Sequence, residues 1–257
     1  MIKYTCGDNM RDIEKGRKKI RFKLVRLFLK IIIRKPKILF LGDEFSKDRP
    51  YMFLVNHCGK KSPLKMDLYF KNDFRIWGIY EMTLGFKSVR KYLITTYYHQ
   101  KRHLPKWLAW IVGTIVSPLV ASYYLGMRII PTYTDIRFAK TIRETIDSVE
   151  NNRSIMIFPE DSSDGYKKEI PAFFSGFAMA LDKLYKKGYD LDLYVGYLLK
   201  KKNTFVVMSP KKYSELKEQY KTNDELSEAM RLEMNSLVDF DTKKYAKEHN
   251  IKIRKVR

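Results

Sequence analysis

The chain contains the runs Tyr51-Met52-Phe53-Leu54-Val55-Asn56-His57 and Ile155-Met156-Ile157-Phe158-Pro159-Glu160. Each is a short apolar run that ends abruptly in polar or ionisable residues. This pattern is typical of a buried strand that delivers a side chain to the carboxyl edge of a sheet. Open α/β sheets bind their ligands at that edge. We therefore expect the two strands to bring a candidate base, His57, and a candidate acid, Glu160, into one active site.

Strand-like and helix-like segments alternate along the rest of the chain. Further strands are predicted at 38–41, 74–80, 128–131, 191–199 and 204–208. Helices are predicted from Ser62-Pro63 onward, at 135–149, at 171–186 and from 209 to about 245. Such alternation predicts the α/β class, here a single domain with a mixed, largely parallel central sheet flanked by helices.

By residue range, we expect a basic amphipathic helix region at 1–37 and the α/β domain at 38–210. A charged, helical extension at 211–257 should pack on that domain. No internal repeat or low-complexity linker interrupts these parts.

The composition points to anionic partners. The 257 residues include 51 lysines and arginines against 29 acidic residues, a formal net charge of +22. Nucleic acid, anionic lipid or phosphorylated small molecules suit such a surface, although a generally solvated basic surface is the simpler alternative. The two cysteines, Cys6 and Cys58, lack the spacing of a metal site. We therefore expect no metal, reduced thiols of an intracellular protein, and no signal peptide at the start.

Residues 19–35 mix basic and large apolar side chains at helical spacing. Leu24, Leu27, Phe28 and Ile31 follow one face, and basic residues recur at the same period on another side. This pattern predicts an amphipathic helix that docks in a membrane interface. A helix packed on its own domain is the alternative. A nucleic-acid-binding helix is disfavoured because the apolar face is too wide.

Residues 107–127 contain no charged side chain. Their length just suffices to span a bilayer, and aromatic residues lie near both ends. Gly113, Ser117 and Pro118 stand in the middle, and basic residues flank both sides. We therefore expect a bent or hairpin-like buried segment that contacts lipid, in preference to a true span.

Four short blocks carry a resemblance to a known family. They are Asn56-His57, residues 128–131 (RIIP), Phe158-Pro159-Glu160 with Ser162 and Ser163, and residues 173–178 (FFSGFA). In order and spacing they resemble the lysophospholipid acyltransferase family, whose best-known members make phosphatidic acid from 1-acyl-glycerol-3-phosphate. The resemblance runs from about 38 to about 210.

The resemblance implies a membrane-associated acyltransferase of phospholipid biosynthesis. Such an enzyme transfers a fatty acyl group from an acyl-CoA or acyl-carrier-protein thioester, a co-substrate, to a hydroxyl of a lysophospholipid. No further cofactor is implied. His57 would be the general base, and a neighbouring carboxylate would hold its tautomer.

The chain departs from the family at that carboxylate. The aspartate expected five residues after the histidine is replaced by Ser62. We expect an inserted basic loop to let Asp67 return to His57. If Asp67 does not serve, Asp161, Asp164 or Asp43 remain candidates, or His57 works without a partner.

The arginines that hold the acceptor phosphate in the family are also missing. Lys60, Lys61, Lys65 and Arg128 are the candidate substitutes. Asp161 and Asp164 make the loop after Glu160 acidic, which suits an amine or polyol acceptor better than a phosphate.

The predicted site therefore has two sets of residues. The catalytic residues are His57 and Asp67. The substrate-binding residues are Asn56, Lys60, Lys61, Arg128, Phe158, Pro159, Glu160, Asp161, Ser162 and Ser163.

We expect the protein to lie on the cytoplasmic side of a membrane, peripheral or monotopic, with anionic lipid as a partner and no nucleic acid. Three alternatives stay open: a thioester hydrolase, an acyltransferase for a non-glycerolipid acceptor, and a basic membrane-binding protein without catalysis.

Overall fold

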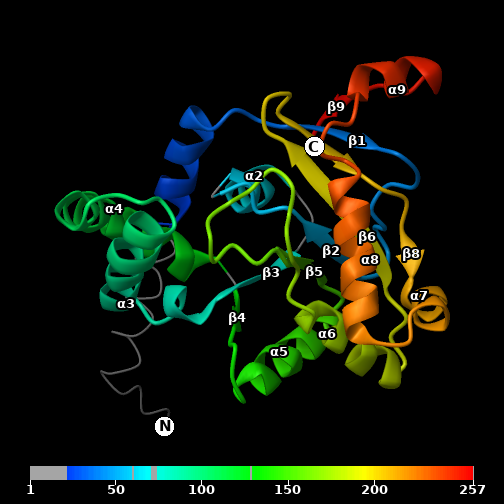
Figure 1. Ribbon diagram of the computed structural model, residues 1–257, viewed down its shortest axis with the longest axis horizontal. Helices are drawn as coiled ribbons and strands as arrows, with labels where there is room; N and C mark the ends of the chain where they lie inside the picture. Colours follow the sequence, from blue (N-terminus) through cyan, green and yellow to red (C-terminus); the bar gives the residue numbers. More distant parts are fainter. Residues whose placement is uncertain (1–21, 60, 71–73, 128, 257) are drawn as a thin grey trace, which may run out of the picture. The chain divides into compact units, whose positions relative to one another are not determined.

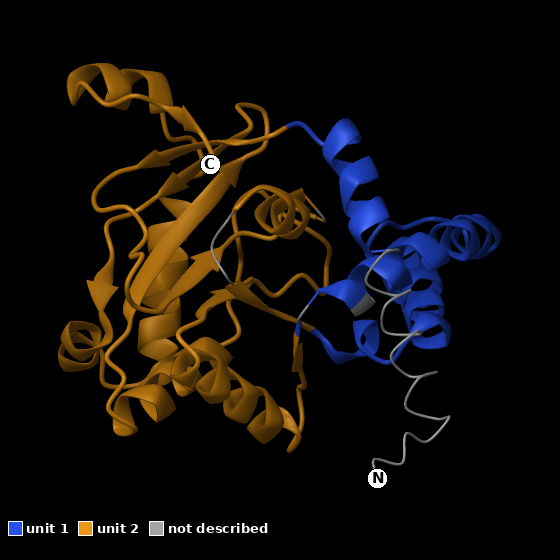
Figure 2. Cartoon of the chain, turned by 180° about the vertical axis from the view of Figure 1, so that it is seen from behind, with its two compact units in different colours: residues 1–34, 79–129 blue, residues 35–78, 130–257 orange. Residues whose placement is uncertain are grey.

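The computed structural model describes residues 22–59, 61–70, 74–127 and 129–256. The chain divides into two compact units (Figure 2). Unit 1 comprises the residues up to Arg34 together with Ile79–Ile129, and unit 2 comprises Lys35–Gly78 together with Ile130–Arg257.

A single mixed sheet organises unit 2 (Figure 1). Within the described residues its strands follow the order β4-β3-β5-β2-β6-β7-β1-β9, with β8 paired to β6. Parallel pairs join β2 to β5 and to β6, β3 to β5, and β1 to β7, and antiparallel pairs join β6 to β7 and to β8, and β1 to β9. The strands are β1 Lys37–Phe40, β2 Tyr51–Val55, β3 Phe74–Ile79, β4 Ile130–Thr132, β5 Ser154–Ile157, β6 Asp192–Leu199, β7 Thr204–Val207, β8 Lys211–Lys212 and β9 Arg254–Lys255.

Helices accompany this sheet in unit 2. They are α2 Lys61–Tyr69, α5 Phe138–Glu150, α6 Gly176–Lys186, α7 Tyr213–Gln219, α8 Asn223–Asn235 and α9 Thr242–Glu248. The predicted α/β class, with a mixed and largely parallel sheet flanked by helices, is confirmed.

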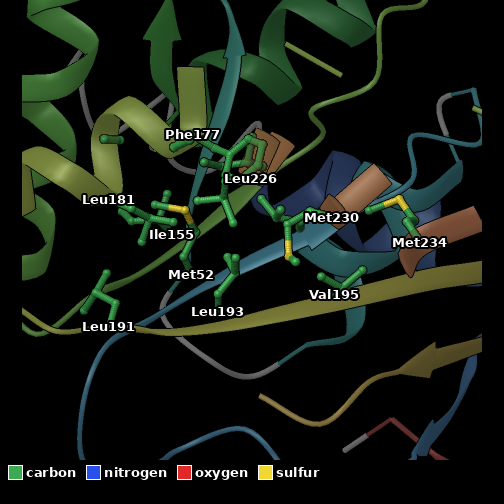
Figure 3. Close-up of a cluster of buried hydrophobic side chains, with 14 of the residues drawn as sticks. Met52, Ile155, Phe177, Leu181, Leu191, Leu193, Val195, Leu226, Met230 and Met234 are labelled. Atoms are coloured by element: carbon green, nitrogen blue, oxygen red, sulfur yellow. The ribbon is translucent and has the colours of Figure 1, made fainter. Parts of the chain in front are cut away.

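The central strands are buried on both faces, which explains why their sequences are continuously apolar rather than alternating. On one face Met52 of β2, Ile155 of β5 and Leu193 of β6 belong to the main core, together with Phe177 and Leu181 of α6 (Figure 3). Leu226, Met230 and Met234 of α8 complete that layer (Figure 3).

Aromatic rings fill the opposite face of the same strands. The ring of Phe45 lies 5.0 Å, centroid to centroid, from the rings of Tyr51, Phe53 and Tyr194. Tyr51 and Phe53 alternate with Met52 along β2, so one strand supplies both layers. Gly196 allows the close approach of β6, because a Cβ there would lie 2.7 Å from the Phe53 ring.

Two predicted helix starts are wrong by a few residues. The helix predicted from residue 135 begins at Phe138, because the Asp135 carboxylate accepts the Arg137 N–H and holds a turn before it. The helix predicted from residue 171 begins at Gly176. Phe173 is bridged to Glu160 instead, so the chain before α6 runs extended.

Unit 1 is helical. It contains a helix at residues 22–32, η1 Tyr80–Met82, α3 Phe86–Tyr92, η2 Leu93–Gln100 and α4 Lys106–Gly126. The Phe22 ring lies 5.7 Å from the Tyr123 ring, which places the start of the first helix beside the end of α4. Gly113 allows α4 to approach η2, since a Cβ there would lie 2.6 Å from Ile94.

The predicted hairpin at 107–127 is wrong, because α4 is one helix of 21 residues that continues through Pro118. Proline lacks the N–H that would bond the Thr114 carbonyl, and the Ser117 hydroxyl donates to that carbonyl instead, at 3.0 Å. By length and composition alone, Lys106–Tyr124 is the one stretch of the described residues apolar enough to cross a membrane.

Unit 1 exposes many of its large apolar side chains. On the first helix they are Leu24, Leu27, Phe28, Ile31 and Ile32, and on α4 they are Trp107, Trp110, Ile111, Ile115 and Leu119. The face predicted to be apolar in residues 19–35 is therefore outward-facing wherever it is described.

The predicted part boundaries at residues 37 and 210 differ from the division into units. Residues 79–129, predicted as part of the α/β domain, cluster with the first helix. Residues beyond 210 supply Leu216, Leu226 and Met230 to the main core.

Candidate active site

The ends of β2 and β5 meet at one edge of the sheet. The strands are parallel neighbours, and Leu54 is registered with Ile157. Three residues beyond each partner come His57 and Glu160. The two runs that the sequence singled out therefore end side by side, as expected.

Two aromatic rings from the segment after β5 lie against the His57 ring. The imidazole lies 5.2 Å, centroid to centroid, from the Phe158 ring in an edge-on arrangement. The Tyr166 ring stacks on it at 4.8 Å with an interplanar angle of 26°. The imidazole is half-buried, and it is held between the residue that follows β5 and the loop that follows Glu160.

A tight turn after His57 supplies a hydrogen-bond partner for the ring. Cys58 and Gly59 both adopt positive φ angles, 47° and 67°. This conformation brings the Gly59 carbonyl oxygen into hydrogen-bond contact with His57 Nδ1. In the tautomer that this contact favours, Nδ1–H donates to the carbonyl and Nε2 carries the lone pair. The backbone contact at Nδ1 therefore favours a His57 ring with its lone pair on Nε2.

The helix α2 starts directly after this turn. The Ser62 N–H donates to the His57 carbonyl oxygen at 3.4 Å, and Ser62, at the family's aspartate position, is fully buried. Asp67 is half-buried in the second turn of the helix. Its predicted role as the partner of His57 stays a prediction.

Asn56 joins two strands at the site. It is 3% exposed, and its Oδ1 accepts the Leu198 N–H at 2.7 Å. The amide thereby fixes the end of β2 to β6 and sets the position of the neighbouring His57. Its predicted contact with substrate stays a prediction.

The residues after β5 are fixed by the segment that precedes α6. Pro159 and Glu160 are buried, and the Phe174 N–H donates to the Pro159 carbonyl oxygen at 2.8 Å. The Asp161 N–H donates to the Ala172 carbonyl oxygen at 2.9 Å. This backbone pairing holds the Glu160 side chain at the sheet edge.

The acidic loop beyond Glu160 folds on itself. The Asp161 carboxylate accepts the Ser163 N–H at 2.9 Å, and Gly165 N–H donates to the Ser162 carbonyl at 3.1 Å. Ser162 is half-buried and Ser163 is exposed. The loop then leads to Tyr166, the ring that stacks on His57.

Of the predicted basic residues, Lys60 and Arg128 lie outside the described residues. Lys61 is exposed at the first position of α2. Lys65 is 7% exposed and donates to Asn203 Oδ1 at 2.6 Å.

Burial governs the electrostatics around the histidine. It raises the pKa of the Cys58 thiol, and the charges of Lys200, Lys61 and Lys65 oppose this while Glu160 reinforces it. A thiol with a raised pKa is a poor nucleophile at neutral pH.

Burial also raises the pKa of the Tyr197 phenol to about 12, with smaller contributions from Cys58 and Glu160. That phenol donates to the Lys168 carbonyl oxygen at 2.6 Å.

Three features of the site were missed by sequence reasoning: the Gly59 carbonyl, Tyr166 and Lys200. The glycine after Asn-His-Cys was a signal for an unusual turn. Tyr166 and Lys200 carry no local pattern that separates them from other tyrosines and lysines. No group of three or more potential metal ligands occurs among the residues with described positions.

Among known proteins, one solved structure resembles the chain weakly. No protein-family model and no curated protein matches the chain. One similar solved structure is the 1-acyl-sn-glycerophosphate (LPA) acyltransferase PlsC from Thermotoga maritima, at 14% sequence identity and a TM-score of 0.46. The alignment covers 88% of this chain and 81% of that protein.

Proposed function

We propose that the protein is an acyltransferase that moves a fatty acyl group from an acyl-CoA or acyl-carrier-protein thioester to a hydroxyl of a lysophospholipid. The observation that carries the proposal is the register of β2 and β5. Leu54 pairs with Ile157, so the Asn-His block and the Phe-Pro-Glu block end together. In the family that the sequence resembles, these two blocks form the active site.

His57 acts as the general base. Its Nδ1–H donates to the Gly59 carbonyl, which leaves Nε2 to take the proton of the acceptor hydroxyl. The acceptor oxygen then attacks the thioester carbonyl and forms a tetrahedral oxyanion. Collapse of this intermediate breaks the carbon–sulfur bond, and the departing thiolate receives the proton from the imidazolium. Base catalysis of this kind contributes about 10²–10⁴-fold.

Tyr166 and Phe158 hold the ring in place for this step. The stacked and edge-on contacts, at 4.8 and 5.2 Å, restrict rotation of the imidazole. Glu160 is 8% exposed at the same edge, and in this proposal its carboxylate contacts the acceptor hydroxyls. Asp67 remains the proposed carboxylate partner of the base.

Unit 1 places the enzyme on the cytoplasmic face of an anionic membrane in this proposal, as a peripheral or monotopic protein. Support comes from its outward apolar side chains, among them Ile31 at 79% exposure and Ile115 at 73%. Exposed Lys23 and Lys30 accompany the apolar residues of the first helix. An apolar face bordered by basic residues suits an interface with anionic headgroups.

The test is release of CoA thiol from an acyl-CoA with 1-acyl-glycerol-3-phosphate as acceptor. His57→Ala should lower turnover by about 10²–10⁴-fold. The matched control is His249→Ala, which should retain full turnover. His249 is an exposed histidine at the C-terminal end of α9. Sedimentation of both variants with phosphatidylglycerol vesicles should be unchanged.

Equal turnover in the His57→Ala protein would overturn the assignment of the base. Thiol release without an acceptor would identify a hydrolase instead. Vesicle binding without any thiol release would favour the membrane-binding alternative that lacks catalysis.

A further inference from the structure

Lys200 is the first residue of the turn at 200–203, directly after β6. The strand β6 is parallel to β2, with Gly196 registered opposite Val55. Because β2 ends at Val55 and β6 continues to Leu199, the turn follows the same sheet edge as His57. The Asn56 amide accepts the Leu198 N–H and fixes this arrangement.

A second contact fixes the turn against α2. Asn203, which ends the turn, accepts a hydrogen bond from Lys65 Nζ at 2.6 Å. Lys61 lies four residues before Lys65, so both occupy one face of the helix. The face of α2 that carries Lys61 is therefore the face that meets the turn carrying Lys200.

The exposed side chains of Lys61 and Lys200 are not paired with a carboxylate of the described part of the chain. Neither Lys61 nor Lys200 forms an ion pair with any residue that the structure describes, whereas Lys65 is buried on Asn203. Both act electrostatically on Cys58, next to the base, and so does the Glu160 carboxylate. Two free ammonium groups in one place match the charge of a phosphate monoester dianion.

The start of α2 does not offer an alternative anion site. Its first N–H groups, those of Lys61 and Ser62, donate to the Cys58 and His57 carbonyl oxygens. The next residue, Pro63, has no N–H. An anion at this edge would therefore be held by lysine side chains rather than by the helix terminus.

We propose that Lys61 and Lys200 form a binding site for a phosphate group of a substrate at the β2–β6 edge, beside the base. This inference rests on the proposed acyltransferase function for the identity of the substrate. The phosphate belongs either to the acceptor, as in 1-acyl-glycerol-3-phosphate, or to the acyl donor, whose CoA portion also carries phosphate. In either case the site takes the place of the arginines that the sequence lacks near β4 and β5.

Cys58 provides a readout that does not depend on turnover. In a Cys6→Ser background the remaining thiol is Cys58, and its alkylation by iodoacetamide measures the thiolate fraction. Glycerol 3-phosphate and CoA are the probes, and glycerol is the uncharged control. A dianion bound beside Cys58 raises the thiol pKa and should slow alkylation by at least about threefold.

Lys200→Gln should abolish that protection, and Lys201→Gln, the same charge change one residue along the turn, should preserve it. Protection by glycerol 3-phosphate alone assigns the site to the acceptor, and protection by CoA alone assigns it to the donor. If neither glycerol 3-phosphate nor CoA slows the alkylation of Cys58, the proposal is overturned. It is also overturned if a probe protects Cys58 equally in the Lys200→Gln and Lys201→Gln proteins.

Turnover supplies the second measurement. Lys200→Gln should raise the KM of the phosphate-bearing substrate by about tenfold to a hundredfold, the usual effect of one charge-assisted contact. With monoacylglycerol as acceptor the KM of the acceptor should not change. Equal KM values in the Lys200→Gln and Lys201→Gln proteins would contradict the site. Protection of Cys58 without any turnover would refute the acyltransferase and leave the phosphate site standing.

Discussion

The two units differ in how far their large apolar side chains are exposed. In unit 2, Leu184 of α6 is 0% exposed and Leu193 of β6 is 1% exposed, within one continuous core. In unit 1, Leu27 of the first helix is 61% exposed and Ile115 of α4 is 73% exposed. Similar apolar residues are thus buried in one unit and exposed in the other.

The difference shows that an apolar stripe on a helix predicts the helix but does not predict what covers the stripe. In α6 the stripe is covered because β5 and α8 offer a matching apolar layer. In unit 1 a small cluster forms around Val89, Leu93 and Ala121, while large side chains such as Leu27 and Ile115 remain exposed. Monomeric proteins rarely leave a large apolar surface without a partner, which is why we propose lipid as the partner of unit 1.

Charges placed on the exposed face of unit 1 should have the largest effect. Leu27→Asp with Ile31→Asp removes two apolar side chains from the interface, and burial of each is worth about 1.5–3 kcal/mol. Binding to phosphatidylglycerol vesicles should fall by about a hundredfold or more, as measured by sedimentation.

The matched control changes two exposed apolar residues of unit 2, Ile136→Asp with Leu232→Asp; these side chains are 93% and 55% exposed. Vesicle binding of this control should be retained. If both double variants lose binding equally, the two units do not differ in the way proposed.

A large-to-small change in each unit should separate them by stability. Leu184→Ala opens a cavity in the core of unit 2 and should lower the free energy of unfolding by about 2–5 kcal/mol. Ile115→Ala removes an exposed side chain and should change it by less than about 0.5 kcal/mol. Urea denaturation of the two proteins in detergent-free buffer measures both values. Equal losses would show that Ile115 is packed in solution.

Much of the fold was predictable because buried strands are short and apolar. The apolar runs at 51–55 and 154–157 were correctly predicted to be strands. Because each run ends in polar residues, the two ends were expected at one edge of the sheet, which requires parallel strands. The hairpin-like form expected at 107–127 did not occur, because α4 continues through Pro118 and the Ser117 hydroxyl bonds the carbonyl that Pro118 cannot reach. A hydrogen bond from a serine side chain to the carbonyl left unbonded by a proline cannot be predicted from the pattern of apolar residues.

The site was predictable only in part, for a similar reason. His57 and Glu160 stand directly after strands, so topology alone brings them together. The Gly59 carbonyl is a backbone group placed by two positive φ angles, and Tyr166 reaches the ring from a loop. Gly59 signalled only an unusual turn and Tyr166 carried no local pattern, so neither contact with the ring could be predicted from the sequence.

The Cys58 thiol tests how strongly unit 2 excludes water beside His57. Burial is the largest influence on this group and raises its pKa above the ordinary value. Since the neutral thiol is favoured, alkylation of the Cys6→Ser protein should stay slow at neutral pH. It should accelerate only at a higher pH than the alkylation of a free cysteine does. Measured rates that rise already near pH 7 would show that the edge is open to solvent.

The smallest effect is expected at Ser62. This residue stands where the family has its aspartate, and its hydroxyl is buried without a hydrogen-bond partner among the described residues. Since Nδ1 of the base bonds the Gly59 carbonyl, Ser62→Ala should leave turnover within about twofold. Removal of an unsatisfied hydroxyl should leave stability unchanged or raise it by about 1 kcal/mol.

Ser227→Ala is the matched control for this change, because Ser227 of α8 also has a buried hydroxyl without a described partner. Both variants should behave alike in urea denaturation and in thiol release. A tenfold loss of turnover confined to Ser62→Ala would show that the hydroxyl at the aspartate position serves the base. The backbone carbonyl would then be insufficient to orient the imidazole, and the two strand ends would need a side chain from α2 to complete the site.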